Sequence, residues 1–345
     1  MNATPLLSVC IVAYNQEFFM KKVLDSILAQ KVDFEYEIVI GEDCSTDGTR
    51  RICEEYVAAH PDKIRLLENS DGNLGLNLNF LRTFKACRGK YIAYLESDDY
   101  WCCEDKLQRQ VNILEREDDV VLVHTNYKVW DVKKDVYYER QIRFYGECIR
   151  ERQSGIEAVK AMFALKTRGV KTSTCVYRRA VLEEILKEDE FAYANKAFPT
   201  QDFQLFIDMS YRGRFAFIDE ETTVIGLGDT ISANSDIMKR YKFVKGYYNI
   251  GVYYIDKYSV PIESAQIWFQ NELHWLVNFA FNHSECLEEV KGIVEEAVAR
   301  KYSVTRSQKM LLWGAKHRFV HKMTFPIYRK YVKKKDKACA LMSND

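Results

Sequence analysis

The sequence has few prolines and glycines, no surplus of charge and no long hydrophobic run, and each absence excludes a class of protein. Only 5 residues are proline and 15 are glycine, which argues against long disordered linkers. The 50 basic residues balance the 50 acidic ones, so no global positive field indicates a nucleic-acid partner. No stretch approaches the roughly 18 consecutive apolar residues of a transmembrane helix. These absences leave an ordinary globular protein, in line with its 47% hydrophobic and 29% charged residues.

The N-terminus and the cysteines both favour the cytoplasm. The first five residues have no basic region and lead directly into an apolar run, so we expect no cleaved signal peptide. None of the ten cysteines forms a C-x-x-C pair with zinc spacing, and several, such as Cys10 and Cys175, lie within apolar runs. We therefore expect a cytoplasmic protein with reduced thiols rather than disulfides or a zinc site.

Apolar runs alternate with amphipathic segments through the first 125 residues. The pattern predicts strands at 7–13, 37–41, 64–67, 91–95 and 120–123, with helices between them at 18–29, 49–59, 77–87 and 106–116. Strands separated by helices of this length form βαβ units. The first part of the chain is therefore predicted to be an α/β domain with a mainly parallel central sheet flanked by helices.

The remainder of the chain has a weaker pattern. We expect a hairpin within 133–152, a strand over 170–177, a helix over 202–211 and an edge strand over 215–219. Beyond residue 234 the sequence is mostly helical and rich in aromatic residues. We therefore predict three parts: 1–128, 129–233 and a basic, helical C-terminal extension over 234–345.

Polar side chains follow three of the predicted strands at the point where each strand ends. Tyr14 and Asn15 follow the first, the acidic segment 42–48 follows the second, and 96–99 follows the fourth. Carboxyl ends of parallel strands meet at one edge of a sheet, where ligands bind. Carboxylates gathered there repel one another unless a cation offsets them, and Mg²⁺ and Mn²⁺ prefer oxygen ligands. The sequence therefore predicts a site for a metal and a diphosphate.

Any one of these clusters has a simpler explanation. Asp47 and its neighbours Ser45 and Thr46 are typical helix caps, and acidic residues in the 96–99 segment are consistent with solvated loop charges. We favour a cap only for Asp47, because polar clusters at several strand ends are harder to explain in this way. Trp101, which directly follows the acidic segment, is equally consistent with a sugar contact and with a lid over the core.

The order and spacing of these segments resemble the start of the family 2 glycosyltransferases. The resemblance rests on the segments SVCIVAYN (8–15), EDCSTDGT (42–49), NLG (73–75) and GKYIAYLESDDYW (89–101), and it covers about residues 6–125. It implies the GT-A fold, a Rossmann-like α/β fold, here with a helical C-terminal extension. It also implies inverting transfer of a sugar from a nucleotide-sugar donor, as in bacterial polysaccharide synthesis.

The resemblance gives individual residues a role. Asp43 would hydrogen-bond the nucleobase, the Ala13-Tyr14-Asn15 turn would flank the base and ribose, and Asn73 would shape the pocket wall. The implied donor-binding residues are Ala13, Tyr14, Asn15, Glu42, Asp43, Asn73, Ser97 and Asp98. The implied ligands of Mn²⁺ or Mg²⁺ are Asp99, Asp98 and Glu96. Glu42 and Glu96 both stand where the family usually has aspartate.

Asp202, which opens an amphipathic segment, matches the catalytic base of the family. Inverting transfer needs a carboxylate within hydrogen-bond reach of the acceptor hydroxyl. Asp202 is also a plausible helix cap. The Tyr-Arg pair that the family often has after the catalytic helix is missing from the segment 224–232, so the basic contact to the diphosphate would come from elsewhere, either Lys171 or Arg178.

The resemblance favours a UDP-sugar donor, a glycan or lipid-linked acceptor and a hexosyl- or N-acetylhexosaminyltransferase. One rival is a sugar nucleotidyltransferase, but the segment 13–17 lacks that class's glycine-rich phosphate loop. Another is a sugar-nucleotide binding protein without catalysis. The basic, aromatic segment from Lys301 onward is consistent with a solvated face and equally with peripheral contact to the anionic inner membrane surface.

Overall fold

The computed structural model describes residues 4–69, 72–140, 155–164, 170–227 and 236–317. Its centre is a nine-stranded sheet in the order β3-β2-β1-β4-β8-β6-β9-β5, with β7 paired to β6. The strands are β1 (Leu7–Ala13), β2 (Tyr36–Glu42), β3 (Ile64–Leu66), β4 (Tyr91–Glu96), β5 (Tyr100–Trp101), β6 (Val120–Asp131), β7 (Val136–Arg140), β8 (Val176–Arg178) and β9 (Arg214–Leu227). Most paired residues are in parallel register, through β1–β2, β1–β4, β2–β3 and β6–β9.

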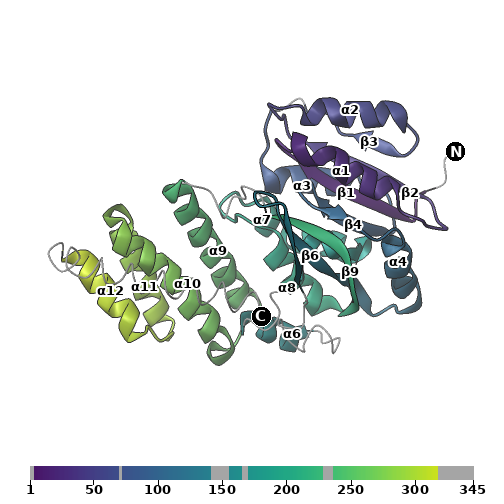
Figure 1. Ribbon diagram of the computed structural model, residues 1–345. Coiled ribbons are helices and arrows are strands. Elements are labelled where there is room, and N and C mark those ends of the chain that lie inside the picture. The colour runs from purple at the N-terminus through teal and green to yellow at the C-terminus, as the bar shows by residue number, and fades with distance from the viewer. Residues whose placement is uncertain (1–3, 70–71, 141–154, 165–169, 228–235, 318–345) are drawn as a thin grey trace.

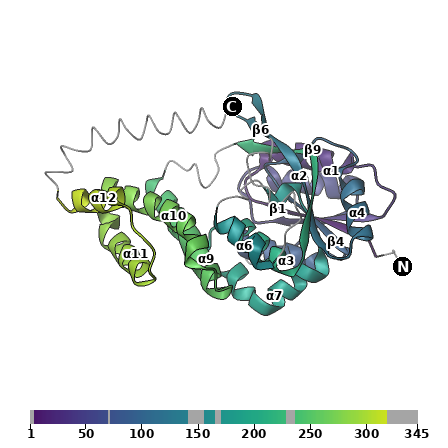
Figure 2. The same cartoon turned by 90° about the horizontal axis from the view of Figure 1, so that it is seen from below.

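Helices cover both faces of this sheet (Figures 1 and 2). They are α1 (Glu17–Leu28), α2 (Thr49–Ala59), α3 (Leu76–Ala86), α4 (Lys106–Arg116), α6 (Gly155–Phe163), η2 (Thr172–Thr174), α7 (Arg179–Ala194) and α8 (Asp202–Arg212). The core is correspondingly divided: α1, α2 and α4 pack on one face, and α3, α6, α7 and α8 on the other. Because β1 and β2 are buried along their whole length, their apolar runs need not alternate with polar residues.

A helical lobe follows the sheet and lies beside it in Figure 1. It consists of α9 (Ile237–Lys257), α10 (Ile262–Asn282), η4 (Ser284–Cys286), α11 (Leu287–Ala299) and α12 (Arg306–Lys316). The expected GT-A-like α/β fold and helical C-terminal extension are both confirmed. Within the described ranges, no helix combines the length and the apolar character needed to cross a bilayer.

A buried carboxylate on α8 ties this lobe to the sheet domain. Asp208 is fully buried, and its oxygens accept hydrogen bonds from the hydroxyls of Tyr193 (2.8 Å), Tyr254 (2.7 Å) and Tyr258. Lys257 Nζ lies 2.9 Å from the same carboxylate. Since three of the four partners come from the C-terminal part of α9 and the residue after it, the lobe has a fixed position against α8.

The structure refines two predicted strands. The 215–219 segment is the first part of the longer β9; it pairs with β6 on one side, whereas β5 pairs with β9 only further along, at Thr223 and Val224. Only the end of the 170–177 segment is a strand, because Thr172–Thr174 form a 3₁₀ turn. Of the segment 133–152, which was predicted to contain a hairpin, the structure describes one strand, β7, and this strand pairs with β6 before that segment; residues 141–152 lie outside the described residues. The division at 128 stays a prediction, and β6 runs through that position.

Candidate active site

Three parallel strands bring the predicted site residues to one edge of the sheet. The register pairs Ala13 with Glu42 and Val12 with Glu96, so β1, β2 and β4 end together. The sheet order turns here, because β2 lies on one side of β1 and β4 on the other. Such a reversal opens a crevice at the carboxyl ends of the strands. The predicted nucleotide-binding and acidic segments therefore lie at the edges of the same crevice.

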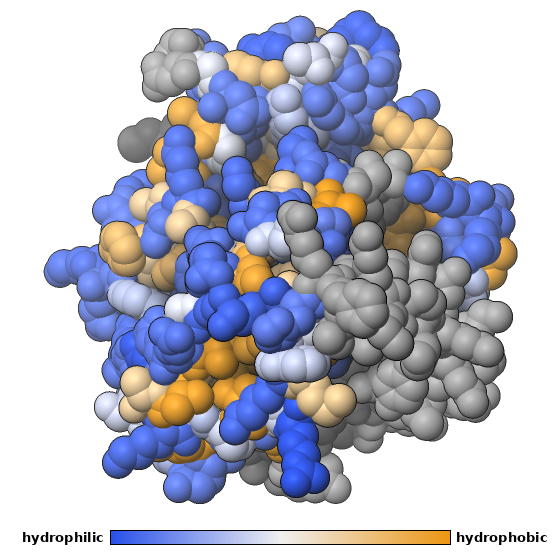
Figure 3. All heavy atoms as spheres, turned by 90° about the vertical axis from the view of Figure 1, so that its left-hand side faces the viewer, coloured by the Kyte–Doolittle hydropathy of each residue, from blue (hydrophilic) through white to orange (hydrophobic). Residues whose placement is uncertain are grey.

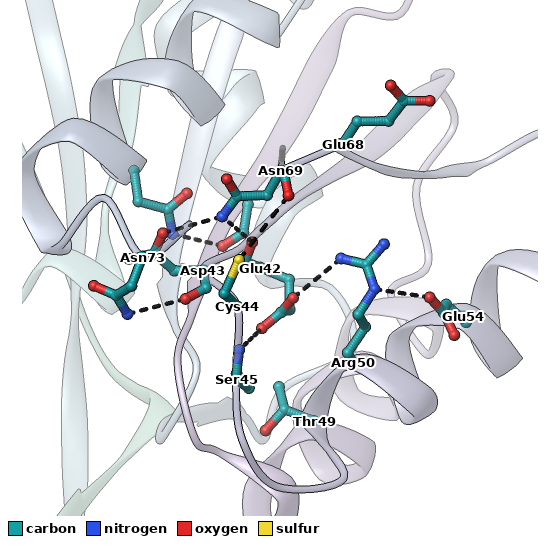
Figure 4. A network of polar contacts seen from close by, with 12 residues as sticks. Glu42, Asp43, Cys44, Ser45, Thr49, Arg50, Glu54, Glu68, Asn69 and Asn73 are labelled. Atoms are coloured by element: carbon teal, nitrogen blue, oxygen red, sulfur yellow. Dashed lines mark hydrogen bonds and ion pairs between the residues drawn. The ribbon is translucent and has the colours of Figure 1, made fainter. Parts of the chain in front are cut away.

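Asp43 ties the loop after β2 to the segment before α3 (Figure 4). Its Oδ1 accepts the amide hydrogen of Leu74 at 2.8 Å, and its Oδ2 accepts that of Gly75 at 2.8 Å. Asn73 Nδ2 donates to the Asp43 carbonyl at 3.0 Å. Gly75 has φ +82°, a conformation that costs glycine little. Asp43 thus fixes the conformation of residues 73–75, which are expected to form a wall of the donor pocket, and it is only 2% exposed.

Glu42 and Asn15 also organise the loop after β2. Glu42 is fully buried; its carboxylate accepts the Ser45 amide hydrogen at 2.6 Å and lies 3.2 Å from Arg50 Nη1 (Figure 4). Asn15 Oδ1 accepts the amide hydrogen of Thr46 at 2.8 Å. Ala13 is buried below this loop, whereas Tyr14 is 46% exposed. A direct contact of any of these side chains with the donor stays a prediction.

The expected capping by Asp47 is present. Its Oδ1 accepts the amide hydrogen of Thr49, the first residue of α2, at 3.0 Å. Its Oδ2 accepts that of Glu17, the first residue of α1, at 3.1 Å. Asp47 therefore stabilises the start of two helices that flank the crevice.

Glu96, Asp98 and Asp99 form an acidic cluster at the end of β4. One carboxylate oxygen from each lies within 4.8 Å of the others. Asp99 is buried, while Glu96 and Asp98 keep part of their surface exposed. Ser97, between them in the sequence, is buried. We refer to Glu96, Asp98 and Asp99 as the acidic triad.

The acidic triad is electrostatically unfavourable without a ligand. Burial and the neighbouring Asp98 raise the pKa of Glu96 to about 7. Burial, Asp98 and Glu96 hold the pKa of Asp99 well above its usual range, and burial raises that of Asp98. Buried like charges raise one another's pKa in this way unless a cation is present. The three carboxylates therefore match the oxygen donor set of a hard divalent cation such as Mn²⁺ or Mg²⁺.

Hydrogen bonds from distant segments position the acidic triad. The Thr172 hydroxyl donates to Glu96 and the Ser173 hydroxyl to Asp99, each at 2.5 Å, and the Gly226 amide donates to Asp99 at 2.9 Å. Any side chain at Gly226 would collide with the Asp98 carbonyl, because a Cβ there would lie 2.4 Å from it. These three residues were missed at the sequence level. The one sequence feature that could have indicated Thr172 and Ser173 was the polar run 171–174 inside an otherwise apolar segment.

Of the two basic candidates for the diphosphate contact, the structure brings only Lys171 to the acidic triad. Burial alone would lower the pKa of Lys171, but Tyr127 and the nearby Asp202, Glu96 and Asp99 raise it above its usual value. Arg178 instead pairs in register with Tyr91, at the opposite end of β4. Its guanidinium donates to backbone carbonyls at the end of α4 and the start of β6, so it cannot serve this site.

Asp202 begins α8 and borders a cavity next to the acidic triad. Its Oδ1 accepts its neighbour's amide hydrogen, that of Phe203, at 2.7 Å. It lies close enough to Glu96 to raise the pKa of that carboxyl. Asp202, Thr200 and Lys171 line one wall of the cavity. Asp202 therefore combines a helix-start position with access to a pocket.

Trp101 is a packing residue in this structure. Its side chain is 4% exposed and belongs to the core below β1 and β4. Its Nε1 donates to the Ser173 carbonyl at 2.9 Å, which helps to hold the 172–174 turn against the acidic triad. The alternative of a sugar contact therefore has no support in the position of this ring.

Comparison with known proteins was made in sequence and in structure. The model of the family described as glycosyl transferase family 2 matches residues 8–186, just over half of the chain. The putative glycosyltransferase EpsE of Bacillus subtilis is 34% identical over 132 residues, which are 38% of this chain and 46% of EpsE. The chain aligns with less than half the length of such curated relatives.

Two solved structures share the fold over most of the chain. Residues 1–349 of TarS of S. aureus, in complex with UDP-GlcNAc, superpose with a TM-score of 0.60 and 17% identity over 94% of this chain and 91% of that TarS chain. The mannosyltransferase PcManGT from Pyrobaculum calidifontis, in complex with GDP-Man and Mn²⁺, gives a TM-score of 0.52 and 14% identity over 94% and 87% of the two chains. At these identities the likeness shows the fold alone.

Proposed function

The chain belongs to glycosyl transferase family 2, as the sequence motifs predict, and we propose that it transfers a sugar with inversion from a UDP-sugar to a hydroxyl of a glycan or lipid-linked acceptor. A hexose or an N-acetylhexosamine is the proposed sugar. The choice of UDP is supported by the fold shared with TarS, which was solved with UDP-GlcNAc. PcManGT, which was solved with GDP-Man, makes GDP the alternative to test.

The acidic triad beside Lys171 and Asp202 is the observation that carries this proposal. Glu96, Asp98 and Asp99 would hold Mn²⁺ or Mg²⁺, which would offset the charge on the leaving nucleoside diphosphate. Lys171 would add a second positive charge to the same group. PcManGT was solved with Mn²⁺, which supports this assignment.

The loops after β1 and β2 would bind the nucleoside. The backbone and side chains of the 13–15 turn, together with Asn73, would border the base and ribose. Both oxygens of Asp43 already accept backbone hydrogens, and Oδ1 also accepts a hydrogen bond from Asn69 Nδ2 at 3.3 Å, but a carboxylate has about four acceptor sites, so one would remain for a bond to the base. Glu42 would act through the loop that it holds, and Ser97 and Asp98 would approach the ribose and diphosphate.

Asp202 would act as the base. The acceptor oxygen attacks the anomeric carbon and forms the new C1–O bond, while its proton passes to the Asp202 carboxylate. The bond between C1 and the diphosphate oxygen breaks, and its electron pair leaves with the nucleoside diphosphate. Attack on the face opposite the leaving group inverts the anomeric centre.

Calorimetric titration of UDP, dTDP, GDP and CMP, with Mn²⁺ and then with EDTA, tests the donor site. We expect metal-dependent binding of UDP, with dTDP as the other pyrimidine that satisfies the same contacts. Binding of none of the four would refute the proposal. Binding without any turnover of UDP-sugars, and without any effect of Asp202→Asn, would favour the non-catalytic binding protein.

Membrane contact through the C-terminal lobe is a second part of the proposal. The helix α12 carries Arg306, Lys309 and Lys316, and it exposes Met310 (72%) and Trp313 (56%). Figure 3, which faces the C-terminal helices, shows apolar patches among hydrophilic side chains. Basic and apolar groups on one helix suit an anionic membrane surface. Three further aromatic residues of the basic segment from Lys301 onward lie outside the described residues: Phe319, Phe325 and Tyr328. Unchanged sedimentation with anionic vesicles after deletion of residues 317–345 would contradict the role of that segment.

A further inference from the structure

A cavity joins the proposed catalytic base to the C-terminal lobe. Its volume is about 440 Å³, within the range of small-molecule sites in proteins. One wall contains Lys171, Thr200 and Asp202. Much of the remaining lining comes from α9 and α10, so the lobe forms part of the cavity. A molecule bound there would extend from the Asp202 carboxylate toward the lobe.

The walls contributed by the lobe and by α8 are mainly apolar. They include aromatic rings from three helices: Phe206 on α8, Phe243 and Tyr247 on α9, and Trp275 and Phe279 on α10. Neighbouring rings keep this wall in place, since Tyr247 packs against Phe203 with centroids 5.2 Å apart. Trp275 remains 49% exposed, so part of the wall is accessible to a ligand.

This lining suits a hydrocarbon better than a chain of sugar rings. Each sugar hydroxyl that loses contact with water needs a hydrogen-bond partner, and an unpaired one is costly. Outside the wall with Asp202, the charged side chains of the lining are Arg240 and Glu272. Arg240 is exposed and forms no ion pair with another residue that the structure describes. A cation next to an aromatic wall matches an anionic group attached to an apolar chain.

We propose that this cavity binds an amphiphilic acceptor, in which an alkyl or isoprenoid chain lies on the aromatic wall of α9 and α10 and an anionic linker faces Arg240. The inference rests on the proposed function, because it places the acceptor hydroxyl at Asp202. It selects the lipid-linked acceptor over a free glycan. It also gives the lobe a part in acceptor recognition.

The test compares decyl phosphate with methyl phosphate, below the concentration at which decyl phosphate forms micelles. Binding to the full chain is measured by calorimetry, in wild type, Trp275→Ala and Ile267→Ala. Ile267 is the matched control, because it is also a half-exposed apolar side chain of α10 but does not line the cavity. Circular dichroism checks that all three proteins are folded.

We expect decyl phosphate to bind at least about a hundredfold more tightly than methyl phosphate, because several methylenes leave water. Trp275→Ala should weaken the binding of decyl phosphate about tenfold, and Ile267→Ala less than about twofold. Arg240→Gln should weaken the binding of decyl phosphate but not that of decyl glucoside, which lacks the anion. Equal binding of the decyl and methyl compounds, no binding of either, or equal losses in Trp275→Ala and Ile267→Ala would overturn the proposal.

Titration of UDP with Mn²⁺ in the same three proteins separates this inference from the proposed function. Trp275→Ala should leave UDP binding unchanged, because Trp275 lies on the acceptor side. If the wild type binds decyl phosphate but not UDP, only the donor site is refuted. If it binds UDP but not decyl phosphate, only the acceptor cavity is refuted.

Discussion

Carboxylates at opposite ends of the parallel strands of the sheet are compensated in different ways. At the amino end of β2, Glu37 accepts hydrogen bonds from Arg88 Nη2 at 2.7 Å, from Arg65 Nε at 3.1 Å and from the Ser8 hydroxyl at 2.7 Å. At the carboxyl end of β4, Glu96 and Asp99 accept hydrogen bonds only from neutral hydroxyl and amide groups among the described residues.

The pKa shifts follow this difference. Burial opposes ionisation of Glu37, but its hydrogen bonds with Arg88 and Ser8 bring its pKa below the usual value. Burial and mutual repulsion raise the pKa values of Glu96 and Asp99 instead. The charge of Glu37 is thus compensated by two arginines of the same chain, Arg65 and Arg88. The acidic triad is short of positive charge, which a ligand would supply.

The largest effect is expected from Asp202→Asn. Asp202 is neither a compensated carboxylate like Glu37 nor a member of the acidic triad. Removal of the base should lower turnover about a thousandfold, because proton transfer to a positioned group contributes roughly 10²–10⁴ in rate. UDP binding should stay within about twofold of wild type. Turnover is measured as release of UDP from the sugar donor that proves active, with Asp62→Asn, at an exposed position, as control. A decrease equal to that of the control would remove Asp202 from the mechanism.

Asp99→Asn should have the next largest effect and separates binding from stability. Loss of a ligand charge should weaken Mn²⁺-dependent UDP binding by about a hundredfold. Without metal the free energy of unfolding should stay unchanged or rise, because one repelling charge disappears, while the amide oxygen can still accept the Gly226 amide hydrogen and the amide nitrogen can donate to the Ser173 hydroxyl oxygen. Titration calorimetry and urea unfolding measure the two quantities. Destabilisation without metal would mean that the carboxylate is compensated within the chain, as Glu37 is.

Glu37→Gln should change stability in the opposite direction. Two arginines would lose their buried partner, and we expect the free energy of unfolding to fall by about 2 kcal/mol; this is below the range for fully buried pairs because both arginines are partly exposed. Urea unfolding with and without Mn²⁺ measures it. Metal should not restore the loss, since Glu37 lies at the other end of the sheet.

The pH dependence of the Glu37→Gln effect follows from the lowered pKa. A carboxyl whose pKa is lower in the folded protein contributes stability above its unfolded pKa and loses that contribution as the pH falls through the folded value. The difference between wild type and Glu37→Gln should therefore be constant above about pH 5 and shrink as the pH falls below 4.5. A difference that stays constant down to pH 3 would mean that the lost stability comes from packing rather than from charge.

The N-terminal part of the sheet was largely predictable because its information is local. Apolar runs, their spacing and the polar residues at their ends gave β1, β2, β4 and the acidic triad. The contacts that complete the site were not predictable, because Ser173 and Gly226 reach Asp99 across 74 and 127 positions in the sequence. Arg178 was a wrong candidate for the diphosphate contact. Sequence periodicity does not show that β8 runs antiparallel to β4, and this direction places Arg178 at the end of β4 that is far from the acidic triad. The acceptor cavity depends on how α9 and α10 pack, which no motif records.

The smallest effect is expected from Arg51→Gln, which tests whether burial rather than ion pairing makes Glu37 important. Arg51 and Glu55 form an ion pair of 2.6 Å on α2, but their side chains are 64% and 58% exposed. Exposed pairs one helical turn apart contribute little, so the free energy of unfolding should change by less than about 0.5 kcal/mol and less still in high salt. Urea unfolding beside Glu37→Gln gives the comparison. A loss as large as that of Glu37→Gln would show that burial does not make the ion pairs of Glu37 more important than that of Glu55. The difference between Glu37 and the acidic triad would then need another explanation.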